Sequence, residues 1–254
     1  MNREQQLAEA FAGLADSFAD DFDPVVLLDR LAGHCVDIIG ADGVGIMMAG
    51  VRGTLRTMAV SDDSAALLEL FQSQTGEGPC LDCYRTHRPV DAPDLARSTD
   101  RWPRLAPVAM AAGYRSAHAF PLRVSGQTIG AVNLFSTSAG GLRPADLKLA
   151  QALADVAAVA LVHWSPDPVR AIDIQAHGQA ALAAKASVEM AQGMLAEHGG
   201  RDLVEALRVL RAYAARNGGR LTETAQALIR RTLAPDAVLT EGTNELRPEG
   251  TNRP

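Results

Sequence analysis

Two pairs of short apolar runs, each joined by a turn sequence, most constrain the fold that this chain can adopt. The first pair covers residues 44–48 and 55–60, with two glycines between the runs. The second pair covers residues 116–124 and 128–135 and is joined by Ser125-Gly126-Gln127. Apolar runs of this length on either side of a glycine-containing turn are typical of β-hairpins. The sequence therefore predicts an antiparallel sheet that contains two hairpins.

Stretches with helical spacing flank the two hairpins. We expect an N-terminal helix within residues 1–23 and a second helix after Pro24. Apolar residues three to four positions apart also predict helices over residues 61–71 and 142–164. The predicted fold class is α+β, with an antiparallel sheet flanked by helices over residues 24–164.

The charge balance reverses after this predicted domain. Pro166 and Pro168 interrupt the helical pattern, and residues 169–233 then hold nine basic and six acidic residues. The rest of the chain has 15 basic and 24 acidic residues. Such asymmetry suggests that the small C-terminal part can meet a polyanion which the acidic part would repel.

The pattern of residues 165–233 predicts three short amphipathic helices that form a bundle. In the middle helix Leu203, Ala206 and Leu210 gather on one side. Three arginines, Arg208, Arg211 and Arg216, fall on the other side. By spacing alone, these arginines fit an ordinary solvated face at least as well as a binding surface.

The motifs of this bundle resemble those of the ANTAR family of RNA-binding antiterminators. They are AQGML at 191–195, EALRVLRAYA at 205–214 and the turn from Asn217 to Leu221. The resemblance implies binding to hairpin loops in nascent transcripts and transcription antitermination. The RNA-binding residues that it implies are Lys185, Ala191, Gln192, Gly193, Arg208, Arg211, Tyr213 and Arg216.

One position departs from the ANTAR pattern, because the family often has lysine where this chain has Gln192. Glutamine can hydrogen-bond a base or a sugar, but it supplies no charge that attracts phosphate. Tyr213 offers a ring for an unpaired base, although its helical phase also fits a packing role.

The larger domain resembles the GAF domains of actinobacterial regulators. The resemblance rests on GEGPCLDCYRTHRPV at 76–90, APDL at 92–95 and AFPLRVSGQTIGAVNLFS at 119–136, and it covers about residues 20–163. It implies a sensor of an unknown small ligand or of redox state. The fold does not select a ligand, so the sequence names no cofactor.

Cys80 and Cys83 leave three interpretations open. They form a Cys-x-x-Cys that suits a redox pair or half of a metal site, and they also suit small buried residues. A different class of function is a GAF-fold thiol enzyme, similar to free methionine sulfoxide reductases, with one of them as the nucleophile. The attached RNA-binding-like module favours a regulator over an enzyme, and no metal site is expected.

The remaining expectations concern location, assembly and the C-terminus. No stretch approaches the roughly 20 apolar residues that span a bilayer, so we expect a cytoplasmic protein with no membrane partner. Alanine-rich stripes over residues 142–164 and 171–195 favour a homodimer, because small residues permit close helix approach. Residues 234–254 hold few apolar residues and are expected to be disordered.

Overall fold

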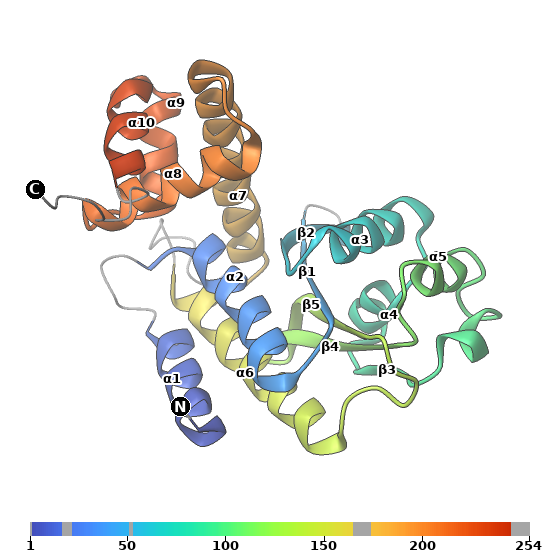
Figure 1. The fold of residues 1–254 in the computed structure, drawn as a ribbon. Helices are drawn as coiled ribbons and strands as arrows, with labels where there is room; N and C mark the ends of the chain where they lie inside the picture. The colour runs from blue at the N-terminus through green and yellow to red at the C-terminus, as the bar shows by residue number, and fades with distance from the viewer. Residues whose placement is uncertain (1, 17–21, 51–52, 165–173, 245–254) are drawn as a thin grey trace, which may run out of the picture. The chain divides into compact units, whose positions relative to one another are not determined.

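The computed structural model describes residues 2–16, 22–50, 53–164 and 174–244 (Figure 1). The chain divides into two compact units, one of residues 1–18 and 26–182 and the other of residues 19–25 and 183–254. No helix among the described residues has the length and apolar character that crossing a membrane requires. The predicted boundary at Pro166 and Pro168 lies outside the described residues.

The first unit is built on a five-stranded sheet in the order β2-β1-β5-β4-β3. Each neighbouring pair of strands is antiparallel. The strands are β1 (Gly43–Ala49), β2 (Leu55–Val60), β3 (Val90–Ala92), β4 (Ser116–Val124) and β5 (Gln127–Ser136). The predicted antiparallel sheet with flanking helices is confirmed, and β1 pairs with β5 to join the two hairpins.

The hairpin of β4 and β5 follows directly from its turn sequence. Only Ser125 and Gly126 separate the strands, and both have positive φ angles, of 50° and 80°. Positive φ at both central residues defines a type I′ turn, whose twist matches that of the flanking strands. The turn fixes the register, in which Val124 pairs with Gln127.

Three helices pack against the sheet and each other around one buried core: α3 (Asp63–Thr75), α4 (Pro79–Thr86) and α5 (Leu105–Ala111). Asp62 begins α3 by accepting hydrogen bonds from the backbone nitrogens of Ser64 and Ala65, and Gly76 ends it with φ of 73°. α4, α5 and the three-residue β3 were not predicted from the sequence. Elements of three to eight residues are too short to show a reliable period.

A second group of helices completes the first unit. α6 (Pro144–His163) packs on β4, and α1 (Arg3–Ala15) packs on α6 (Figure 1). An ion pair between Arg3 and Asp146 links these two helices. α2 (Pro24–His34) continues into a π-helical turn, Cys35–Ile39, which Gly40 ends with φ of 83°.

The second unit is helical. Most of α7 (Ile174–Gly199) belongs to it, together with α8 (Leu203–Arg216), α9 (Leu221–Ile229) and α10 (Pro235–Asn244). The first three are the helices expected from the sequence. α10 corrects the expectation of disorder for part of the tail, because residues 235–244 form a helix that packs on α8.

Candidate nucleic-acid interface and sensor core

The helical unit buries one side of each of α7, α8 and α9. The buried side chains are Ala184, Val188, Ala191, Leu195, Ala206, Val209, Leu210, Ala214, Leu221, Ala225 and Leu228. Leu203 is 56% exposed, which corrects its predicted packing role. It stands at the first position of α8, directly after the capping Asp202.

The predicted RNA-binding residues of α7 differ in their surroundings. Ala191 is fully buried and therefore packs the core instead of facing a ligand. The side-chain nitrogen of Gln192 donates a hydrogen bond of 2.7 Å to the carbonyl oxygen of Leu203, which ties α7 to the start of α8. Apart from neighbouring residues of α7 itself, no described atom lies within 4 Å of the position that a Cβ at Gly193 would take. Lys185 pairs with Glu189 at 3.5 Å.

The arginines of α8 lie at the surface and contact acidic or carbonyl groups. Arg208 makes a bidentate pair with Glu205, through hydrogen bonds of 2.7 and 3.0 Å. Arg216 donates to the main-chain carbonyl of Glu241 in α10. Arg211 is exposed, and Tyr213 is half-buried. Neither the ion pair with Glu205 nor the hydrogen bond to α10 was expected from the sequence.

A basic surface therefore exists on α8, but the protein itself partly neutralises it. Glu205 also pairs with Arg201 at 2.9 Å, so one carboxylate faces two guanidinium groups. Exposed ion pairs contribute only about 0 to 1 kcal/mol, because water screens them and ordering the side chains costs entropy. A polyanion can therefore compete for these arginines at low cost.

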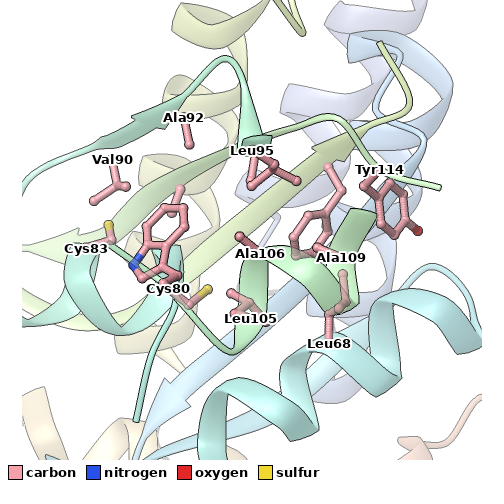
Figure 2. Close-up of a cluster of buried hydrophobic side chains, with 14 of the residues drawn as sticks. Leu68, Cys80, Cys83, Val90, Ala92, Leu95, Leu105, Ala106, Ala109 and Tyr114 are labelled. Atoms are coloured by element: carbon pink, nitrogen blue, oxygen red, sulfur yellow. The ribbon is translucent and has the colours of Figure 1, made fainter. Parts of the chain in front are cut away.

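The buried core of the first unit holds both cysteines of the Cys-x-x-Cys sequence. Cys80 and Cys83 project from α4 into a cluster of buried side chains between the helices and the sheet (Figure 2). Both are fully buried. Burial raises the pKa of Cys83 to about 12, and burial together with the nearby Glu69 raises the pKa of Cys80 well above its usual value. Both groups are therefore neutral thiols at physiological pH, a form with low nucleophilicity.

Glu69 is a buried carboxyl near Cys80 that was not predicted from the sequence as a site residue. It lies on α3 at 0% exposure. Its two oxygens accept hydrogen bonds from Asn133 at 2.9 Å and from Gln72 at 3.0 Å. Gln72 in turn accepts a bond from the backbone nitrogen of Cys80. Burial raises the pKa of Glu69 to about 7, against the opposing effect of the two amide donors.

Gly45 and Gly78 allow this polar network to sit against the backbone. A Cβ at Gly45 would come within 2.5 Å of the carboxyl carbon of Glu69, and one at Gly78 within 2.5 Å of the amide carbon of Gln72. The glycines at positions 45 and 78 are thus the sequence features that correspond to this network. Over the part of the chain that the structure describes, no three His, Cys, Asp or Glu side chains gather closely enough to hold a metal ion.

The geometry of both units agrees with comparisons with known families. The family model of the GAF domain matches residues 23–162, more than half of the chain. This chain belongs to the GAF domain family. The ANTAR domain model matches residues 176–229, so the protein has the architecture of a GAF and ANTAR regulator. Both resemblances inferred from the sequence motifs are confirmed.

Solved structures share the fold of the GAF domain. The GAF domain from an Acinetobacter phosphoenolpyruvate-protein phosphotransferase matches over its full length and 66% of this chain, with 14% identity and a TM-score of 0.50. A free methionine-R-sulfoxide reductase from Neisseria meningitidis, in complex with its substrate, matches over 87% of its length and 62% of this chain, with 18% identity and a TM-score of 0.48. Such low identities show a common fold alone. A search of curated protein sequences finds no match.

The order of the two domains points to a signal-sensing regulator rather than an enzyme. A GAF fold does not by itself decide between these classes. The ANTAR domain is the part that distinguishes them.

Proposed function

We propose that this GAF and ANTAR protein binds hairpin loops in nascent transcripts and promotes transcription antitermination in response to a signal at its GAF domain. The observation that carries the proposal is the ANTAR match over residues 176–229. Arg208 and Arg211 of α8 lie exposed within that match, and the half-buried Gly193 of α7 has open space at its Cβ position.

In the proposed complex, arginine side chains replace their protein partners with phosphates or unpaired bases. Arg208 leaves Glu205, which is a small cost for a surface pair. Its guanidinium then forms charge-assisted bonds with phosphate or stacks on an unpaired base. Arg211 does the same from the next turn. Gly193 lets the RNA backbone approach α7 without a side chain between them.

The test is RNA binding by the full-length chain, measured across a salt series. The probe is an RNA with two short hairpins, and a scrambled RNA of equal length is the comparison. We expect Arg208→Ala/Arg211→Ala to lose the preference for the hairpins and to lower the slope of log affinity against log salt by about 1.4, or roughly 0.7 for each phosphate contact.

A matched control removes the same charge elsewhere. Arg230 and Arg231 follow α9 and are both exposed, so Arg230→Ala/Arg231→Ala should retain hairpin binding. Equal losses in the two double variants would mean that only net charge matters. No preference of the unaltered protein for hairpins over scrambled RNA would contradict the proposed function.

The GAF domain is proposed to sense a small ligand or redox state, and the whole protein to act as a cytoplasmic homodimer. A dimer presents two basic surfaces, which suits an RNA with two adjacent hairpins. Ligand binding would alter RNA affinity only if the ligand has different affinities for the RNA-bound and unbound forms.

The core of the GAF domain weighs against the alternative of a thiol enzyme. A catalytic cysteine needs its thiolate form and access to substrate. Cys80 and Cys83 are fully buried, and their pKa values are raised. Turnover of free methionine sulfoxide with thioredoxin as reductant is the assay that would establish the enzyme instead.

A further inference from the structure

Helix α10 lies beyond the ANTAR match and packs closely on α8. Val238 of α10 is fully buried. Gly242 brings the last turn of α10 against α8, since a Cβ there would lie 2.5 Å from the carbonyl oxygen of Val209 and 2.6 Å from its Cγ1. Such an approach is possible only without a side chain. The glycine at position 242 of α10 therefore permits its close packing on α8.

α10 contacts charged residues of α7 and α8, the helices proposed to bind RNA. The guanidinium of Arg216 donates to the carbonyl oxygen of Glu241. That oxygen belongs to the last four residues of α10 (Pro235–Asn244), whose carbonyls lack partners within the helix and carry the negative end of its dipole. His198 of α7 lies 2.8 Å from Asp236. Arg216 thus caps the C-terminal end of α10.

α10 is acidic, whereas a surface that binds RNA is basic. Its sequence, PDAVLTEGTN, contains Asp236 and Glu241 and no basic residue. A phosphate that approached Arg216 would have to replace the carbonyl of Glu241, and it would meet the negative charge of that residue. The same helix end that satisfies Arg216 therefore keeps it from a polyanion.

We propose that α10 is an internal competitor of RNA: it holds Arg216 in the protein without RNA and releases it when its last turn leaves α8. The proposal rests on the proposed RNA-binding function. It assigns to a segment outside the ANTAR match the role of lowering RNA affinity. If α10 were purely structural, its loss would weaken both the bundle and RNA binding. If it competes with RNA, its displacement strengthens RNA binding.

The test uses Gly242→Ala in the full-length chain. The added methyl group collides with Val209 and displaces the last turn of α10, while alanine itself favours helix. We expect about fivefold tighter binding to the RNA with two hairpins, the order of one net hydrogen bond, and a salt slope that is larger by about 0.7. Thr240→Ala is the matched control, since Thr240 is exposed on the same helix, and it should change neither value.

A second substitution assigns the gain to Arg216. Arg216→Ala should abolish the gain, so that Gly242→Ala/Arg216→Ala binds the hairpin RNA no more tightly than Arg216→Ala alone. A chain that ends at Ala234 removes α10 altogether, but it exposes Val209, so its circular dichroism must match that of the full chain before its affinity is compared.

Each outcome decides between the two proposals. If the unaltered protein prefers the hairpin RNA and Gly242→Ala binds equally or more weakly, α10 is structural and the competitor is rejected. A gain that persists in Gly242→Ala/Arg216→Ala rejects it as well. If neither the unaltered protein nor Gly242→Ala prefers hairpins over scrambled RNA, the proposed function itself fails.

Discussion

Glu69 places a carboxyl group at 0% exposure between α3 and the sheet. The pKa of this group rises from 4.5 to about 7, because burial disfavours the ionised form more than the two amide donors favour it. Below about pH 4.5 the group is protonated in the folded and unfolded states alike. As the pH rises from 4.5 towards 7, the unfolded chain loses this proton while the folded chain keeps it, so stability declines.

Glu69→Gln should remove this dependence and keep the size of the side chain, with one oxygen still able to accept a hydrogen bond. We expect the free energy of unfolding of the unaltered protein, relative to the variant, to fall by up to about 3 kcal/mol between pH 4.5 and pH 8. Urea denaturation of both proteins over that range measures it. The difference between the two proteins excludes other titrating groups, and parallel pH profiles would contradict an elevated pKa at Glu69.

The cysteines give a second prediction at this scale. The chain has three, and Cys35, Cys80 and Cys83 are all buried and unpaired. We expect none to react rapidly with a thiol reagent in the native protein and all three to react after denaturation, because burial excludes the reagent and keeps the thiols protonated. Rapid modification of Cys80 or Cys83 in the native state would instead support redox sensing.

A glycine in the sheet allows α3 to pack closely against it. Gly45 lies in β1, and a Cβ there would collide with Glu69 of α3. Gly45→Ala should therefore lower the free energy of unfolding by about 1 to 3 kcal/mol, the usual cost of overpacking. Gly33 of α2 is the matched control, since apart from its own neighbours in the helix no described atom lies within 4 Å of its Cβ position.

Gly33→Ala should leave stability unchanged or raise it by about 1 kcal/mol, because alanine favours helix. Chemical denaturation of the two variants measures the contrast. Equal effects would show that α3 adapts to the added methyl group. Helix periodicity could predict α2 and α3, but it could not predict this contact, which joins residues 24 positions apart through a buried carboxyl.

For the whole molecule, assembly is the main prediction. Val159 of α6 is 44% exposed on a helix whose other apolar residues are mostly buried. We expect sedimentation to give about twice the chain mass of 26.8 kDa, and Val159→Glu to shift the protein to the monomer, because a buried unpaired charge at a helix interface is costly.

Leu67 of α3 is 53% exposed and provides the control. Leu67→Glu should leave the mass unchanged if dimerisation uses α6. A monomeric unaltered protein over the whole concentration range, or equal effects of the two substitutions, would contradict a dimer through this helix.

The sequence by itself determined the two hairpins, the longer helices and the order of the two domains, because turn chemistry and side-chain periodicity act over a few neighbouring residues. Only the tertiary structure decided which side chains remain available for chemistry. Arg216 is held by Glu241, 25 positions away, and Glu69 is bonded to Asn133, 64 positions away. Spacing along a helix indicates which way a residue faces, but its charge and burial depend on the elements that fold against it.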